Sequence, residues 1–267
     1  MKEKIKDVGK KRIIAYVAIM ICCIVAIWVF FRLKKPTRLN DLAYDVNKQH
    51  GYTVYVEEKS GYVPYLVLTN NYEGNRNVLL VRKHILEEHQ PYNVDYNTNA
   101  YYEESYIDQY LNAGYLLTLS PGVQECMVNS RIRIQNSSVW SGGGPRGEPD
   151  ITYIDRKVFL LSFMEVAPAS IGSFPKDGKG LRYFKDNINR FIAQDASGEL
   201  TSWTLRSGLA EDIMSNIIIT YDKRVSSCSI FDSMGIRPAF CLSRDMEIVE
   251  DNTIKEGLNV FVLKVPE

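Results

Sequence analysis

The sequence predicts an α+β fold: an antiparallel sheet with two or three helices and long loops, preceded by one N-terminal transmembrane helix. Three observations predict this class. An uncharged apolar stretch occupies residues 13–31. Short runs rich in β-branched and aromatic residues dominate the rest of the chain. The few segments with helical periodicity interrupt the strands without alternating with them, which favours α+β over a doubly wound sheet.

The predicted membrane helix reads IIAYVAIMICCIVAIWVFF over residues 13–31. At about 1.5 Å per residue it would extend for about 28 Å, close to the hydrocarbon thickness of a bilayer. A buried core helix is an alternative, but such a helix is seldom apolar on every side. A cleaved signal peptide is another, but its apolar region would be shorter and would end in small residues, whereas Trp28 and its bulky neighbours lead directly into Arg32. We therefore expect an uncleaved anchor.

The formal net charge of zero conceals an asymmetry. Residues 1–38 carry ten Lys or Arg against two acids, a net charge of +8, so residues 39–267 carry −8. An acidic globular part argues against a nucleic-acid partner, because neutralisation of phosphates supplies most of such affinity. More basic residues precede the apolar stretch than follow it, which favours a cytoplasmic N-terminus and an extracellular C-terminal domain.

Four segments are expected along the chain. They are a cytoplasmic tail at 1–12, the transmembrane helix at 13–31, a juxtamembrane linker at 32–50 and an extracytoplasmic globular domain at 51–267. The lipid bilayer, contacted through residues 13–31, is thus a predicted partner. The predicted location is the cell membrane, crossed once.

The globular part begins with three predicted strands, at 52–56, 62–68 and 77–82. A helix follows over 103–113, where Ser105 as N-cap and Asp108 three residues later form a capping box and Gly114 ends the helix. A second short helix follows Ser120, with a proline in its first turn. Residues 135–150 and 167–180 read as loops, and a helix is expected from 181 to about 193. The remaining strands are expected at 158–161, 203–206, 217–221, 225–231, 236–242 and 259–265.

Five strings resemble, in their order along the chain, an uncharacterised domain of surface-exposed proteins of Gram-positive bacteria. They are VLLVRKHIL, YYEESYIDQYLNAGYL, VFLLSFMEV, SWTLRSG and GIRPAFCLS, and the resemblance covers residues from about 52 to 245. More distantly, WTLRS at 203–207 followed by GIRP at 235–238 resembles the closing strands of formylglycine-generating enzymes. That resemblance implies a C-type-lectin-like core, a twisted antiparallel sheet that carries long loops.

The formylglycine-generating enzymes use a pair of cysteines to bind copper near this Trp-Arg strand. No cysteine lies in 203–209, and Cys228 and Cys241 match no such pair. These two residues flank a predicted hairpin and either face each other or are buried free thiols, the interpretation that we favour. His84 and His89 are five residues apart and do not share a helix face. We therefore expect no catalytic residue, no metal site and no cofactor.

Arg206 and Arg237 are the most specific polar positions of the closing strands. They could hold an anionic ligand through bidentate contacts. The alternative is structural: each could pair with a carboxylate and pin strands together, the candidates being Asp155, Glu165 and Asp232. Because both arginines lie among apolar neighbours typical of a core, the structural role is favoured.

The loop at 135–150 contains the other candidate binding residues. Glu148, Pro149 and Asp150 resemble the loop by which some C-type lectins hold calcium and sugar, although several more oxygen ligands would be needed; an exposed turn is the alternative. Trp140 could stack on a sugar or insert into a partner, or fold back onto the domain.

The function predicted from these features is a membrane-anchored, extracytoplasmic binding module of a bacterial cell envelope, without catalytic activity. Its partner would be a cell-wall glycan or an envelope protein. Two alternatives stay open: an oxidoreductase of the formylglycine-generating type, and a structural subunit of an envelope complex that docks through the 135–150 loop.

Overall fold

The computed structural model describes residues 16–17, 19–25, 35–46, 51–103, 105–135, 151–168, 176–209, 212–251, 253–254 and 260–265. Contacts within the chain divide it into two units, Met1–Pro36 and Thr37–Glu267.

The first unit has exposed helical residues at 16–17 and 19–25. Among the described residues, no helix combines the length and the apolar character needed to cross a membrane. This finding corrects the predicted transmembrane helix at 13–31 and the single-pass cell-membrane location, with its cytoplasmic N-terminus and extracellular domain, that was inferred from it.

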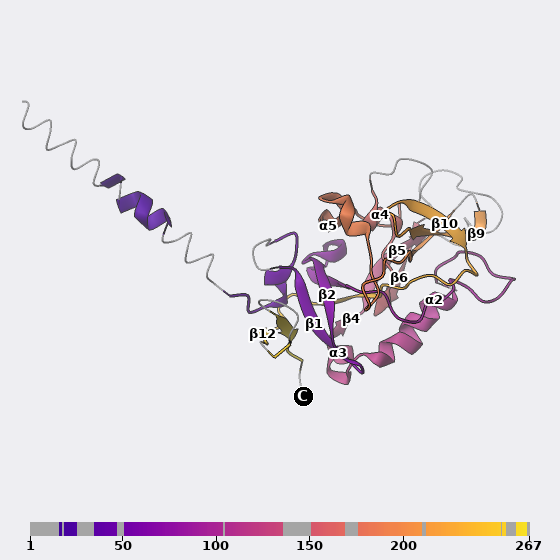
Figure 1. The fold of residues 1–267 in the computed structure, drawn as a ribbon, viewed down its shortest axis with the longest axis horizontal. Coiled ribbons are helices and arrows are strands. Elements are labelled where there is room, and N and C mark those ends of the chain that lie inside the picture. Colours follow the sequence, from indigo (N-terminus) through magenta and orange to yellow (C-terminus); the bar gives the residue numbers. More distant parts are fainter. Residues whose placement is uncertain are drawn as a thin grey trace, which may run out of the picture. The chain divides into compact units, whose positions relative to one another are not determined.

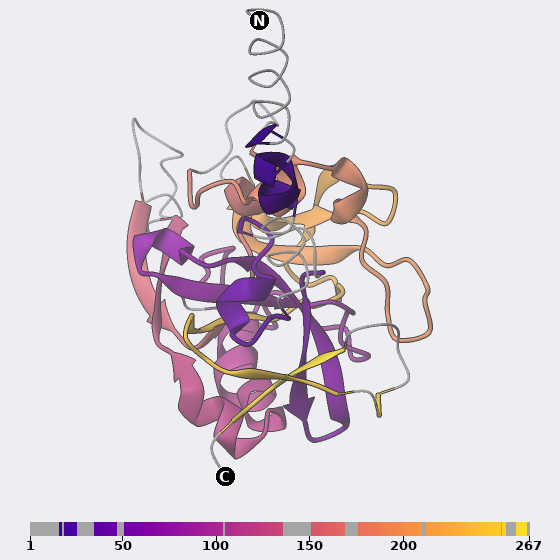
Figure 2. The ribbon, with the colours of Figure 1, turned by 90° about the vertical axis from the view of Figure 1, so that its left-hand side faces the viewer.

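The second unit is built on an eight-stranded sheet in its described part (Figure 1). Seven strands follow the order β12-β13-β1-β2-β3-β11-β4, and β7 also pairs with β11. Their bounds are β1 (Thr53–Glu58), β2 (Gly61–Thr69), β3 (Asn77–Arg82), β4 (Met127–Val128), β7 (Val158–Phe159), β11 (Ala239–Ser243), β12 (Ile248–Glu250) and β13 (Phe261–Leu263). Figure 2 shows the yellow C-terminal strands crossing beside the purple strands of the N-terminal half.

Two smaller sheets are found in the described part of this unit. One has the order β10-β9-β8, formed by β8 (Trp203–Leu209), β9 (Asp212–Ile219) and β10 (Val225–Ser229). The other pairs β5 (Ser130–Gln135) with β6 (Ile151–Arg156). Among the described strands every pair is antiparallel except β1 and β13, which run parallel.

The helices are short. In the described part of the second unit, the longest helical segment begins with α2 (Tyr106–Gln109), continues as a π-helix, η3 (Tyr110–Gly114), and ends as a 3-10 helix, η4 (Tyr115–Thr118). Gly114 does not end it, because its backbone stays helical at φ −85° and ψ −65°. The other helices described in this unit are η1 (Leu39–Leu42), η2 (Tyr72–Gly74), α3 (Pro121–Cys126), α4 (Phe163–Val166), α5 (Arg182–Lys185) and η6 (Ile188–Phe191).

The fold class therefore differs from the predicted one. The described residues form a mostly β structure around a mixed sheet, and not an α+β, C-type-lectin-like antiparallel sheet. The physical reason is twofold: β13 pairs with β1 in parallel, and the helix expected over 181–193 forms only two four-residue pieces, α5 and η6. Strand pairing between distant segments thus dominates the architecture.

One hydrophobic core joins the three sheets and the helices. Strands β3 and β11 are each flanked by other strands of the main sheet, and their apolar side chains are buried on both faces. The core also includes Leu39 and Leu42 of η1, which are fully buried. Residues 37–46, assigned from sequence to the linker, thus pack with the globular unit.

Candidate functional site

Arg206 of β8 is buried and has no N–H donor left for a ligand. Its five donors all have acceptors: Arg133 O, Leu160 O, Asp177 O and both carboxylate oxygens of Glu165, at 2.7–2.9 Å. Burial by itself lowers the pKa of Arg206, but the charge and hydrogen bonds of Glu165, together with Tyr72 and Asp177, more than offset this, so that the pKa lies above its ordinary value. Of the three carboxylates proposed from sequence, Glu165 is the partner. Arg206 thus binds α4 to β8.

The carboxylate of Glu165 is saturated as well. It accepts hydrogen bonds from Tyr72 Oη at 2.7 Å and from Ser162 N at 2.8 Å, in addition to Arg206. Ser162 and Glu165 form the capping box of α4. Since every group of this buried pair has a partner within the fold, the pair is a closed structural network.

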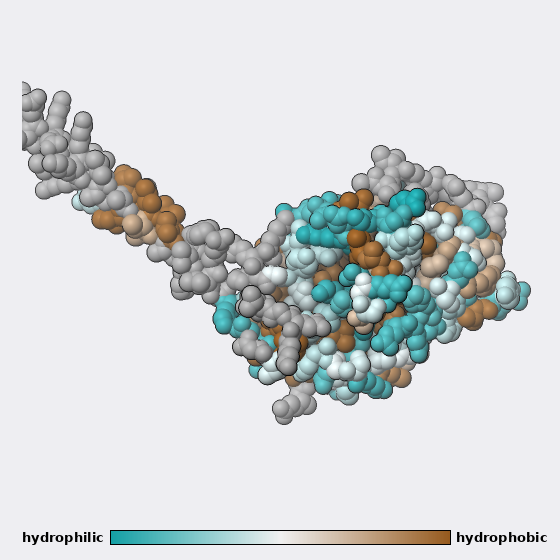
Figure 3. Space-filling model, viewed as in Figure 1, coloured by the Kyte–Doolittle hydropathy of each residue, from teal (hydrophilic) through white to brown (hydrophobic). Residues whose placement is uncertain are grey.

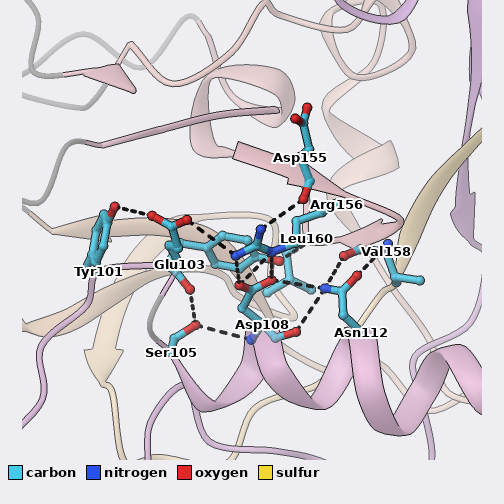
Figure 4. Close-up of polar contacts among 10 residues, drawn as sticks. Tyr101, Glu103, Ser105, Asp108, Asn112, Asp155, Arg156, Val158 and Leu160 are labelled. Atoms are coloured by element: carbon cyan, nitrogen blue, oxygen red, sulfur yellow. Dashed lines mark hydrogen bonds and ion pairs between the residues drawn. The ribbon is translucent and has the colours of Figure 1, made fainter. Parts of the chain in front are cut away.

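A second closed network fastens the long helical segment to β6 and β7 (Figure 4). The Ser105 Oγ caps α2 by accepting from Asp108 N at 3.3 Å, which confirms the predicted N-cap. The Asp108 carboxylate accepts from Arg156 Nε and Nη2 at 2.8–2.9 Å and so does not complete the predicted capping box. Asn112 adds hydrogen bonds to both backbone groups of Val158. Burial raises the pKa of Asp108 even though Arg156 opposes the shift.

Arg237 has a different environment from Arg206. The residue is 2% exposed. Its Nε donates to Arg82 O at 3.2 Å, and its guanidinium lies over the Trp203 ring, 4.8 Å from the centroid. Its Nη1 is buried and has no hydrogen-bond partner in the described part of the chain. Burial lowers the pKa of Arg237 to about 10, with only Tyr183 opposing the shift. The side chain is therefore charged at neutral pH. No carboxylate among the described residues forms an ion pair with it.

The segment before Arg237 is pressed against the start of β8. Gly235 forms a bridge with Trp203 and accepts a hydrogen bond from Thr204 N at 3.0 Å. A Cβ at position 235 would lie 2.7 Å from Ser202 O and 2.9 Å from two carbons of Ile85, so only glycine fits. This close approach places Arg237 over the indole ring.

Arg237 lines a cleft of about 570 Å³. Besides Arg237, two cations line it: Lys83, which follows β3, and Arg190 of η6. The other residues of the lining are Gly51, Tyr52, Thr53, Leu66, His84, Tyr183, Asn189, Ile192, Gln194 and Leu200. No carboxylate is found among the described residues that line the cleft, so its formal charge is +3 with neutral histidine.

Arg190 is held in place by three tyrosines. The rings of Tyr44, Tyr52 and Tyr183 lie edge to face, with centroids 5.3–5.4 Å apart. The Arg190 guanidinium lies 4.3 Å from the Tyr44 centroid and 4.7 Å from that of Tyr183. Its Nη1 also donates to Tyr183 O at 2.8 Å. Cation–π contacts of this kind fix the cation at the wall of the cleft before any ligand arrives.

On the face seen in Figure 3, hydrophobic residues of the globular unit occur in small groups between hydrophilic ones. No large apolar patch stands out in the described part of that face. The cleft around Arg237 is a hollow of the described surface that is lined by a buried cationic side chain with an unsatisfied donor.

The structure separates the binding residues predicted from sequence. Arg206 lies in the closed network with Glu165, whereas Arg237 lines the cleft. Trp140, Glu148 and Asp150 lie outside the described residues. Sequence reasoning did not single out Lys83, Arg190 or the tyrosines around Arg190. A basic residue directly after a buried strand was a usable signal for Lys83, but no local pattern brings residues 52, 83, 190 and 237 together.

The two cysteines discussed above lie in different sheets and are unpaired. Cys228 belongs to β10 and is half-buried, and Cys241 belongs to β11 and is fully buried. Burial raises the pKa of both thiols to about 12, so both are protonated at neutral pH.

Comparison with known proteins identifies a family. The family described as "Domain of unknown function (DUF6273)" matches residues 75–244, which confirms the resemblance to an uncharacterised domain. No curated protein and no solved structure matches the chain. The matched residues include Lys83, Arg190 and Arg237, whereas Tyr44 and Tyr52 precede them. Because the match covers more than half of the 267 residues, the protein belongs to this family of unknown function.

Proposed function

We propose that the globular unit is a binding module without chemistry of its own, and that the cleft around Arg237 receives an anionic group. The observation that carries this proposal is the buried, charged guanidinium of Arg237, which lines the cleft with Nη1 unpartnered among the described residues. A buried charge without a partner costs several kcal/mol. An anion in the cleft would offset this cost and would satisfy the orphaned donor.

The charges around Arg237 support the same proposal. Lys83 and Arg190 add two cations to the lining, and their attraction for an anion acts in a partly water-excluded cleft. Arg190 is preorganised by its tyrosine contacts, so little side-chain entropy is lost when a ligand binds. The lining thus suits recognition of negative charge.

This proposal restricts the range of partners predicted from sequence. A cell-wall glycan or an envelope protein of Gram-positive bacteria would fit only if it presented an anionic group. Docking through the 135–150 loop, as a structural subunit, stays a prediction. An oxidoreductase of the formylglycine-generating type finds no support in Cys228 and Cys241, which lie in separate sheets as neutral thiols.

Thermal unfolding of the purified chain tests the proposal. We expect sulfate, at constant ionic strength, to raise the unfolding midpoint of the wild type in a saturable manner. At one hundred times Kd the stabilisation would be about 2.7 kcal/mol, or a shift of roughly 5–10 °C for a domain of this size. In Arg237→Gln this saturable shift disappears, because the variant lacks the charge that faces the cleft.

Two comparisons make the test specific. Arg224→Gln removes an exposed arginine whose ion pair with Asp222 lies on the surface, and it should respond to sulfate as the wild type does. Sulfate also stabilises proteins through exclusion from their surface, an effect that all variants share. An equal sulfate-dependent shift in the wild type and in Arg237→Gln would refute the proposal.

A further inference from the structure

We infer that the cleft binds an organic phosphate, with the phosphate group at Arg237 and a hydroxyl-bearing, sugar-like body against the tyrosine wall. This inference rests on the proposed function and names the ligand class of the same cleft. It is carried by three properties of the lining: its charge, its volume and the mixture of groups beyond the cations.

The charge of the lining favours phosphate over a carboxylate. Lys83, Arg190 and Arg237 contribute three positive charges, and none of the described lining residues is acidic. A carboxylate brings one negative charge and would leave two cations uncompensated. A phosphate monoester carries a charge of about −1.5 to −2 at neutral pH and three strong acceptor oxygens. Both arginine and lysine are well suited to such a group, the first through its planar fork and the second as a point charge.

The volume of the cleft indicates a ligand larger than inorganic phosphate. The cleft measures about 570 Å³. The five heavy atoms of phosphate would fill roughly 150 Å³, even if each is given the full volume of a liquid water molecule, about 30 Å³. More than half of the cleft therefore remains for an organic body, and its total volume lies within the usual range for small-molecule sites.

The remaining lining groups match a polyhydroxylated body. Thr53 brings a hydroxyl group, and Asn189 and Gln194 bring amides that can both donate and accept hydrogen bonds. Tyr52 and Tyr183 provide aromatic surface, on which the apolar face of a sugar ring can pack. The polar groups and the aromatic wall together fit a sugar phosphate better than a purely apolar phosphate ester.

Isothermal titration calorimetry of the full chain with matched probes tests this inference. The probes are glucose 6-phosphate, glucose 6-sulfate, glucuronate, inorganic phosphate and glucose, all at constant ionic strength. We expect glucose 6-phosphate to bind at least tenfold more tightly than each of the other four. Equal affinity for inorganic phosphate would overturn the predicted body, and equal affinity for glucose 6-sulfate or glucuronate would overturn the preference for phosphate.

Variants separate this inference from the proposed function. Arg237→Gln and Lys83→Gln should each weaken glucose 6-phosphate binding about tenfold or more, and Arg224→Gln should leave it unchanged. Lys83 is exposed, so its replacement leaves the fold intact even if Arg237→Gln destabilises the chain. If all the anions bind equally and depend on Arg237, the ligand class is wrong and the binding function stands. If the binding of none of the anions depends on Arg237 or Lys83, both the ligand class and the proposed binding function are wrong.

Discussion

Arg206 and Arg237 are both buried arginines, and the groups around them give them different roles. Arg206 meets Glu165 in a bidentate ion pair and uses all its donors within the fold. Arg237 lies over the indole ring of Trp203, donates a hydrogen bond to one backbone carbonyl and lines the cleft. The sequence singles out both residues, because both lie among apolar neighbours typical of a core. It could not separate their roles, because Glu165 and the lining of the cleft come from distant parts of the chain.

Asp177 is a further residue whose surroundings determine its protonation. The carboxyl is buried, accepts a hydrogen bond from Ser207 Oγ, and leaves Oδ1 without a partner among the described residues. Burial raises its pKa to about 6, although Arg206 opposes the shift. The folded chain therefore keeps this proton to a higher pH than the unfolded chain, in which the pKa is about 3.9.

The titration of Asp177 predicts how stability depends on pH. Between about pH 4 and pH 6 the folded state binds more protons than the unfolded state, so the free energy of unfolding falls as the pH rises, by roughly 3 kcal/mol through this group. Asp177→Asn should remove this contribution and be more stable than the wild type at pH 7. Urea unfolding of both proteins from pH 4 to pH 7 measures it. Parallel curves for the two proteins would contradict the assignment.

At the scale of elements, local patterns predict the strands better than the helices. The strands expected at 52–56, 62–68 and 77–82 are observed as β1, β2 and β3, with small changes at their ends. Their alternation and their β-branched residues are local signals. The helix expected over 181–193 is two short pieces, α5 and η6. No local pattern indicates that β13 pairs with β1, because that contact joins the two ends of the unit.

Gly178 shows how an irregular segment can be as constrained as a strand. The sequence identifies 167–180 as a loop but does not show which of its glycines is required. A Cβ at position 178 would lie 2.5 Å from Ser162 Oγ and 2.8 Å from Glu165 Cγ, so the segment packs directly on the N-terminus of α4. Glycine permits this approach because it has no side chain.

Replacement of Gly178 by alanine should therefore destabilise the globular unit by about 1–3 kcal/mol, because the new methyl group displaces α4 and its bond to Arg206. Gly114→Ala is the matched control. Its backbone is helical and the added Cβ would meet Tyr110 at 3.4 Å, so we expect no loss and a gain of up to about 1 kcal/mol from helix propensity. Chemical denaturation compares the two. Equal effects would contradict the packing of 178 on α4.

At the scale of the whole chain, the family match covers only part of the globular unit. Residues 75–244 contain the three cations of the cleft, whereas β1, β2, β12 and β13 lie outside the match and complete the main sheet. Tyr44 and Tyr52, which hold Arg190, also precede the matched residues. The flanking segments thus help to position the groups that we propose to bind the ligand.

For the chain as a whole, the prediction that depended on the composition of one segment alone was wrong. The apolar run at 13–31 predicts a membrane helix from composition, yet no helix among the described residues is long and apolar enough to cross a membrane. The cleft, by contrast, is formed by residues that are distant in the sequence. They come from β1, the end of β3, α5, η6 and the segment before β11. Such a site becomes visible only once the chain is folded.

The most direct test of the central claim is the position of a bound oxyanion in crystals of the chain. Tungstate has the tetrahedral shape of phosphate, and its anomalous signal locates it without ambiguity. We predict a peak within hydrogen-bonding distance of the Arg237 guanidinium in the wild type and none there in Arg237→Gln. Tungstate bound only elsewhere on the wild-type protein, or bound equally at this position in Arg237→Gln, would contradict the account.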